Sequence, residues 1–166
     1  NILKLSSNNT PMIRYASSYL SHYNSLNMIS LYQKYRRTIN WFLWKPVDFD
    51  GKYANQCVDW IKAYATSLWY RITTSGNAKD FAYVWLGKNW SKVNGEPWIW
   101  DIVVFPTWTY GHIAVVQSIV GNSINVIDQN ADWKAYHNNN AFNLGTPVSY
   151  SQYKLKWNEV YFRVNN

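Results

Sequence analysis

The chain contains one cysteine, Cys57, within the run YANQCVDW. A lone thiol is either a small buried hydrophobic group or a reactive one, and its neighbours decide between the two. A polar, turn-rich segment, VDFDGKYANQ, precedes Cys57, and the apolar face of a helix follows it at Val58, Ile61, Ala65 and Leu68. This pattern predicts a helix that begins at Gln56 or Cys57. The free amides and dipole of a helix amino terminus favour a thiolate, so Cys57 is a candidate nucleophile.

A cysteine nucleophile needs an imidazole that accepts the thiol proton and later protonates the leaving amine. The chain has three histidines. We expect His22, in an N-terminal helical region, and His137, in an asparagine-rich segment, to be ordinary surface residues. His112 follows a glycine and opens the apolar run HIAVVQSIV, so it should stand at the edge of a strand with its ring toward a cleft. His112 is therefore the candidate base.

The imidazole in turn needs a polar group that fixes its orientation. The run VIDQN lies beyond the histidine strand, and strand alternation there would put Asp128 and Asn130 on one face and Gln129 on the other. Either Asp128 or Asn130 could contact His112. For the oxyanion formed during attack on a carbonyl, the backbone amide of Cys57 is the natural first donor, and the second donor is open between Gln56 and Asn130.

The elements that must position these residues follow from the hydrophobic pattern. Apolar residues recur at helical spacing from Met12 to about Tyr35, which predicts one or two helices. Short β-branched runs later predict strands over 102–105, 112–120, 124–128 and 161–164, with Gly121-Asn122 as a hairpin turn. Helices followed by an antiparallel sheet indicate an α+β fold. The run HNNNAFN at 137–143 is expected to be a loop.

Composition sets the class of protein. The 166 residues suit a single domain, 1–166, in which a helical segment, 1–40, packs on a core, 41–166. No apolar run is long enough for a membrane helix, and the initial Asn suggests a monomeric domain of a longer protein. A net charge of +7 favours an anionic partner, which could be nucleic acid, a membrane surface or a bacterial wall that carries acidic polymers. Lysines and arginines are spread along the chain without a nucleic-acid motif, so nucleic acid is not expected as a partner.

Four motifs in order, QC at a helix start, WDIVVF, GHIAVV and VIDQN, resemble the CHAP family of cysteine- and histidine-dependent amidohydrolases and peptidases. The similarity runs from about Val47 to the C-terminus. It implies a papain-like α+β fold with Cys57 as nucleophile, His112 as general base, Asp128 supporting the imidazole and Asn130 completing the site. The family often has Glu where this chain has Asp128, so the resemblance leaves the contact to His112 open between Asp128 and Asn130.

The same resemblance implies a peptidoglycan hydrolase that cleaves a wall amide through a cysteine thioester. Endopeptidase action is slightly preferred over N-acetylmuramoyl-L-alanine amidase action. Such a protein would act on the bacterial cell wall as a secreted, phage-encoded or virion-associated lysin. Two alternatives are a catalytically inactive wall-binding or virion structural module with the same fold, and an acyl-transfer enzyme acting on other substrates.

A calcium ion is also expected beside the nucleophile. Asp48, Asp50 and Asp59 can bring three hard oxygen donors together across one loop and the first helical turn, and calcium takes six to eight such oxygens. The Asp-x-Asp-Gly loop is similar to the calcium-binding subset of the family, which implies these three side chains plus the carbonyls of Lys52 and Ala54 as ligands of a structural ion. The alternative is an acidic turn followed by an Asp that is favoured near a helix start in any case.

Overall fold

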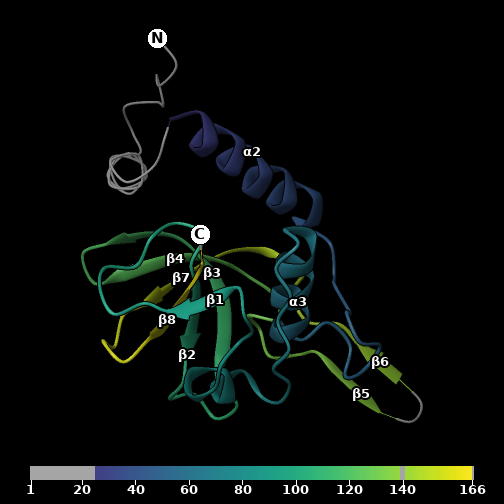
Figure 1. Ribbon diagram of the computed structural model, residues 1–166. Coiled ribbons are helices and arrows are strands. Elements are labelled where there is room, and N and C mark those ends of the chain that lie inside the picture. The colour runs from purple at the N-terminus through teal and green to yellow at the C-terminus, as the bar shows by residue number, and fades with distance from the viewer. Residues whose placement is uncertain (1–24, 139–140, 166) are drawn as a thin grey trace.

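The computed structural model describes residues 25–138 and 141–165. Its helices are α2 (Ser25–Phe42), α3 (Cys57–Ser67) and the short 3-10 helix η1 (Ala78–Tyr83). Its strands are β1 (Trp90–Lys92), β2 (Ile102–Phe105), β3 (His112–Val120), β4 (Ser123–Asp128), β5 (Tyr136–Asn138), β6 (Ala141–Asn143), β7 (Ser149–Lys154) and β8 (Val160–Val164). The predicted α+β class is confirmed, and Figure 1 shows the helices in the first half of the chain and most strands in the second.

Six strands form an antiparallel sheet in the order β1-β8-β2-β3-β4-β7, and β5 pairs with β6 in a separate hairpin. The hairpin turn at Gly121-Asn122 is confirmed, because β3 and β4 pair on either side of it. The four predicted strands are present, with one residue added at the start of β4 and one at the start of β8. The sheet therefore carries His112 at the start of β3 and Asp128 at the end of the neighbouring β4.

Alternating residues of the central strands feed two hydrophobic clusters on opposite faces of the sheet. Ile102 and Val104 of β2 join the cluster that includes Trp60 and Tyr64 of α3. Val103 and Phe105 join a second cluster on the other face. The sheet is thus buried on both sides along β2, whose four residues are all buried, and it is a rigid support for groups at the strand ends.

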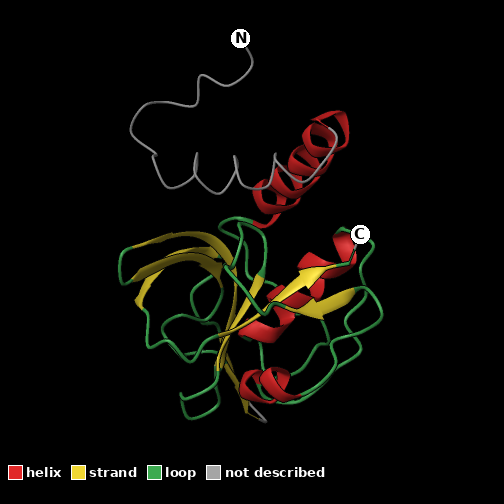
Figure 2. Cartoon of the chain, turned by 60° about the vertical axis from the view of Figure 1, so that its left-hand side comes forward, coloured by secondary structure: helices red, strands yellow, loops and turns green. Residues whose placement is uncertain are grey.

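Helix α2 lies at the outside of the molecule and meets the body through its inward face (Figures 1 and 2). Tyr35 is buried and stacks on Trp100, with ring centroids 5.4 Å apart and an interplanar angle of 5°. Lys34 Nζ donates to the Leu68 carbonyl at 2.7 Å. The part of the expected helical region before residue 25, including His22, lies outside the described residues. Within the described residues, no helix has the length and hydropathy of a membrane span.

The sequence prediction of a loop over 137–143 was wrong at 137–138 and 141–143, where the structure has strands. Tyr136 pairs with Asn143, and Asn138 pairs with Ala141. The short strand β1, the helix η1 and the strand β7 were not predicted. Strand β7 has the sequence SYSQYK, and it pairs with β4 along the whole range from Ser123 to Asp128. A polar strand of this kind carries no hydrophobic alternation for sequence reasoning to find.

Candidate active site

Cys57 is the first residue of α3, as predicted, and is 7% exposed. Gln56 precedes it in extended conformation, with φ −72° and ψ 157°. Its backbone amide donates to Asp59 Oδ2 at 2.9 Å, which fixes the entry into the helix. The Cys57 amide is therefore one of the free N–H groups at the helix start, next to its own thiol.

His112 is placed by a tight turn before β3. Gly111 has φ +71°, and a Cβ atom at this position would lie 2.2 Å from the backbone nitrogen of Lys79. The Lys79 amide donates to the Tyr110 carbonyl at 3.0 Å and holds η1 against this turn. Only glycine fits so close an approach at a positive φ, and the imidazole follows directly at the strand edge.

The His112 ring contacts Asp128, which decides between the two partners considered from the sequence. Nε2 of His112 donates to Oδ2 of Asp128 at 2.7 Å, and the two side chains are 1% and 0% exposed. Nδ1 is buried and makes no hydrogen bond to any described residue. Because Nε2 is taken by Asp128, Nδ1 is the ring nitrogen that remains for proton exchange with Cys57.

The electrostatics of the pair favour an imidazolium. Burial lowers the pKa of His112, but the hydrogen bond to Asp128 and the nearby Cys57 thiol outweigh this effect and raise the pKa to about 9. A histidine with this pKa stays protonated at neutral pH. The arrangement is therefore suited to a thiolate and imidazolium pair, in which a proton is already available for a leaving group.

Two further hydroxyl groups, which sequence reasoning did not identify, donate hydrogen bonds to the carboxylate of Asp128. Ser151 Oγ donates to Oδ1 at 2.6 Å, and Tyr153 Oη donates to Oδ2 at 2.5 Å. Both come from β7, which was not predicted as a strand. The period-two spacing of Ser151 and Tyr153 was the available signal, but it has meaning only once β7 is known to pair with β4.

Asn130 and Gln129 do not continue the predicted alternation. Strand β4 ends at Asp128, and Asn130 has φ +57°, so its side chain turns away from His112. Asn130 Nδ2 donates to Gln56 Oε1 at 3.1 Å, and its Oδ1 accepts from the Ala135 amide at 2.9 Å. Gln129 is fully buried and donates to the carbonyls of Val47 and Gln56. These two residues therefore tie the loop before Cys57 to the end of β4.

Aromatic rings surround the imidazole. Trp108 stacks on His112 with centroids 5.3 Å apart and an interplanar angle of 15°, and the Trp133 ring is tilted against it at 5.7 Å. Phe105 and Tyr153 lie on its other sides at 6.1 and 5.7 Å. Aromatic faces favour a cation, so these rings add to the stabilisation of a protonated His112. Trp133 is 46% exposed and also reaches solvent at the site.

The three carboxylates expected as metal ligands lie together, and one of them, Asp59, is on the first turn of the helix that begins with Cys57. One carboxylate oxygen from each of Asp48, Asp50 and Asp59 lies within 4.8 Å of the other two. Burial raises the pKa of Asp59 to about 7, and the charges of Asp50 and Asp48 add to this rise against hydrogen bonds from the backbone of Gln56 and Phe49. No described lysine or arginine forms an ion pair with any of the three carboxylates. The cluster thus has the oxygen donors and the uncompensated charge that suit a divalent cation.

The family model of the CHAP domain matches residues 47–130, just over half of the chain. The chain belongs to the CHAP family. The matched segment includes Cys57, His112, Asp128 and Asn130, and so covers the four CHAP residues named from the sequence. Strand β7, with Ser151 and Tyr153, lies beyond the matched segment.

The fold is shared with a solved structure. The crystal structure of the wild-type endolysin LysIME-EF1 matches with a TM-score of 0.62 and 18% identity, over 79% of this chain and 62% of that one. The crystal structure of Ly7917 matches with a TM-score of 0.49 and 14% identity, over 78% of this chain and 61% of that one. This chain spans less than two thirds of the length of either protein. No curated protein matches it in sequence.

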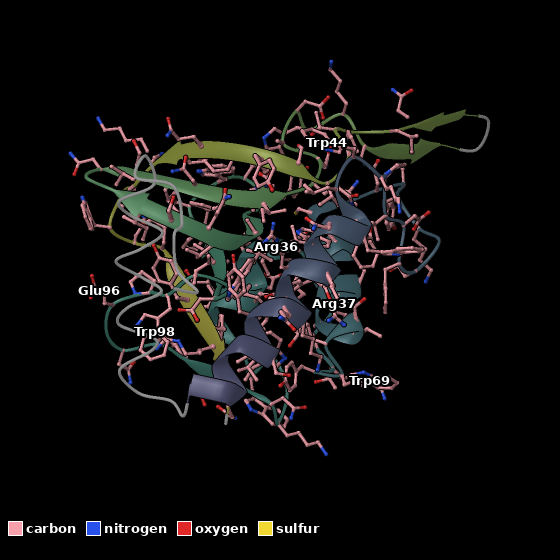
Figure 3. The ribbon with its side chains drawn as sticks, turned by 90° about the horizontal axis from the view of Figure 1, so that it is seen from above. Arg36, Arg37, Trp44, Trp69, Glu96 and Trp98 are labelled. Atoms are coloured by element: carbon pink, nitrogen blue, oxygen red, sulfur yellow. The ribbon has the colours of Figure 1, made fainter. Side chains whose placement is uncertain are left out.

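Other aromatic residues of this CHAP domain are exposed far from one another. Trp44, Trp69 and Trp98 lie at separate places on the surface in Figure 3, with Trp98 near Glu96. Trp44 is 66% and Trp69 86% exposed, whereas Trp98 is half-buried. These three tryptophans therefore do not form one surface patch. His137 lies on β5, and its side chain is outside the described ones.

Proposed function

We propose that this CHAP domain hydrolyses an amide bond in the peptide part of bacterial peptidoglycan, with Cys57 as nucleophile and His112 as acid and base. The observation that carries this proposal is the hydrogen bond of His112 to Asp128, with the Cys57 thiol at a helix start and near enough to raise the His112 pKa. Membership of the CHAP family and the fold shared with an endolysin support the choice of substrate.

The chemistry proceeds in two acyl-transfer steps. The Cys57 thiolate attacks the carbonyl carbon, and the resulting oxyanion is met by the Cys57 backbone amide. The imidazolium of His112 gives its Nδ1 proton to the leaving nitrogen as the carbon–nitrogen bond breaks, and a thioester remains on Cys57. Nδ1 of His112 then accepts a proton from water, which attacks the thioester, and a carboxylate leaves as the thiolate is restored. Asp128 keeps its hydrogen bond to Nε2 throughout.

The Cys57 amide is the oxyanion donor that this geometry favours. Gln56 Nε2 donates to the carbonyls of Tyr53 and Ala135, both at 2.7 Å, so both of its hydrogens are engaged. Asn130 points its amide at Gln56 rather than at Cys57. In this proposal, Asn130 serves the site by holding Gln56, and through it the loop before the nucleophile.

The substrate is proposed to be the bacterial wall, reached from outside the cell or by a phage lysin. A net charge of +7 complements the acidic polymers that surround peptidoglycan. Endopeptidase action is preferred over amidase action on family resemblance alone. End-group analysis of digested peptidoglycan separates them, because an amidase exposes the amino group of the first alanine, whereas an endopeptidase exposes an amino group farther along the peptide. No new amino group in the digest would reject both activities.

The alternative of an inactive wall-binding module would fit a site that had lost one of its chemical groups. Cys57 is a free thiol at a helix start, and His112 keeps its bond to Asp128. An intact nucleophile and base thus favour the enzyme. Wall binding without release of fragments by the unmodified protein would favour the alternative.

We further propose that Asp48, Asp50 and Asp59 hold a calcium ion, together with the carbonyls of Lys52 and Ala54. The converging carboxylates support the side-chain part of this set. Tyr53 and Ala54 have φ +61° and +58°, so the loop bends sharply between the acidic turn and Cys57. Calcium would supply positive charge that joins this loop to Asp59 on the first turn of α3, without contact with the scissile carbonyl. Its role would be to fix the position of Cys57.

A further inference from the structure

The buried carboxylate of Asp128 is held from the edge strand β7 by two hydroxyl groups. Ser151 donates to Oδ1 at 2.6 Å, and Tyr153 donates to Oδ2 at 2.5 Å. His112 donates to the same Oδ2 at 2.7 Å. With 0% exposure, Asp128 has no surface through which water could replace these donors. A buried charge is costly unless its hydrogen bonds are made, so both hydroxyls matter to the state of Asp128.

The direction of the Tyr153 hydrogen bond follows from its surroundings. Burial, and then the Asp128 carboxylate, raise the pKa of the Tyr153 phenol far above its usual range. The phenol therefore keeps its proton and acts as the donor. Its ring also packs against Phe105, Trp108 and His112, at centroid distances of 5.3, 5.2 and 5.7 Å.

Strand pairing explains why two residues of β7 reach one carboxylate. Val126 of β4 pairs with Ser151, and Asp128 pairs with Ser149. Paired residues share a face of the sheet, so Ser151 and Tyr153 lie on the same face as Asp128. Tyr150 points to the opposite face, where its ring contacts Trp44. Donors two residues apart on one strand fix both oxygens of the carboxylate, and hence its plane.

We propose that Ser151 and Tyr153 are positioning residues that lock the Asp128 carboxylate with Oδ2 directed at His112 Nε2. Without this lock, the carboxylate can rotate, and its bond to the imidazole weakens. The consequence for catalysis rests on the proposed function, whereas the effect on His112 does not. The titratable groups that face His112 are Cys57 from α3, Asp128 from β4 and Tyr153 from β7.

Matched substitutions separate the hydroxyl groups from the packing around them. Tyr153→Phe removes one hydroxyl and keeps the ring among its aromatic neighbours. Ser151→Ala removes the other, and Ser151→Thr restores a hydroxyl at the same position. Tyr150→Phe and Ser149→Ala are the controls, because they make the same changes on the same strand at side chains with no bond to Asp128. Melting curves of all five variants confirm that each one is folded.

The readout is the imidazole of His112, followed by ¹⁵N NMR as the pH is varied. The hydrogen bond to Asp128 raises the pKa of His112 against its burial. A weaker hydrogen bond between Asp128 and His112 raises the His112 pKa less. We therefore expect this pKa to fall in Tyr153→Phe and Ser151→Ala. It should return toward the original value in Ser151→Thr and stay unchanged in both controls. An unchanged or higher pKa in the two test variants would overturn the proposal, because the hydroxyls would then compete for Asp128 or leave it unaffected.

Wall lysis supplies a second readout. We expect kcat to fall between about tenfold and a hundredfold in Tyr153→Phe, with KM little changed, because a small misplacement of a catalytic group has costs of that size. The alkaline limb of the pH profile should move to lower pH together with the His112 pKa. Equal kcat and equal pH profiles in Tyr153→Phe and Tyr150→Phe would contradict the positioning role. If the unmodified protein lyses no wall, the proposed function fails, while the NMR result still tests the lock.

Discussion

Neutralising Asp50 should have opposite effects on the stability of the protein without and with calcium. The Asp50→Asn substitution removes one charge from the three-carboxylate cluster and keeps an oxygen that can accept from the Lys52 amide, as Asp50 does at 2.9 Å. Without metal, the substitution removes repulsion and should stabilise the fold. With metal, it removes a ligand and should abolish the stabilisation that calcium confers.

The size of the effect follows from the geometry. Two unit charges 4.8 Å apart repel by about 0.9 kcal/mol in water, and Asp50 faces two such partners, so its neutralisation should contribute about 1 to 2 kcal/mol. For a domain of this size, 1 kcal/mol shifts the melting temperature by roughly 2 to 4 °C. Calcium at a hundred times its Kd should stabilise the unmodified protein by about 2.7 kcal/mol.

The assay is thermal unfolding at low salt and pH 8, above the raised Asp59 pKa of about 7, so that all three carboxylates are charged. In EGTA, Asp50→Asn should melt above the unmodified protein by roughly 2 to 8 °C. In calcium, the order should reverse. Asp132→Asn is the control, because it neutralises a carboxylate outside the cluster and should respond equally in both buffers. Identical melting of Asp50→Asn and the unmodified protein in both buffers would refute the site.

Further predictions concern the reaction itself. Cys57→Ala should abolish lysis with the fold intact, and so should alkylation of the unmodified protein by iodoacetamide, because the chain has no second thiol. Lysis by either protein would show that Cys57 is not the nucleophile. His112→Ala should lose nearly as much, and the double Cys57 and His112 variant no more than either single one, whereas His137→Ala should change the rate less than a few-fold. Lysis should decline as the pH rises through about 9, where His112 loses its proton; a profile still rising above pH 10 would exclude the imidazolium as proton donor. The raised His112 pKa should also stabilise the fold most fully below the unfolded value of about 6.5, with the contribution lost between there and about 9, as pH-dependent unfolding would report.

The catalytic elements were predictable because their signals are local. The helix start at Cys57 follows from a polar loop beside an apolar face, and the β3 and β4 strands follow from β-branched runs with a Gly-Asn turn between them. Order along the chain then suggested that His112 and Asp128 lie on neighbouring strands. The three acidic residues near Cys57 were likewise close enough in sequence to suggest that they converge in space.

What the sequence did not reveal depends on pairing between distant segments. Strand β7 is polar, and only its register with β4 brings Ser151 and Tyr153 to Asp128. Strand alternation left Asn130 as a possible partner of His112 beside Asp128, but a positive φ beyond the end of β4 directs its amide to Gln56. The backbone conformation of Asn130 thus leaves Asp128 as the partner of His112. Residue alternation does not apply beyond the end of a strand, and β4 ends at Asp128.

Cleavage of a bacterial wall amide by the Cys57 thiol is tested most directly by mass spectrometry of purified peptidoglycan after incubation with the unmodified protein and with folded Cys57→Ala. We expect soluble fragments from the unmodified protein alone, each carrying one added water across a single type of amide bond. The same fragments from Cys57→Ala, or intact peptidoglycan after incubation with the unmodified protein, would contradict it.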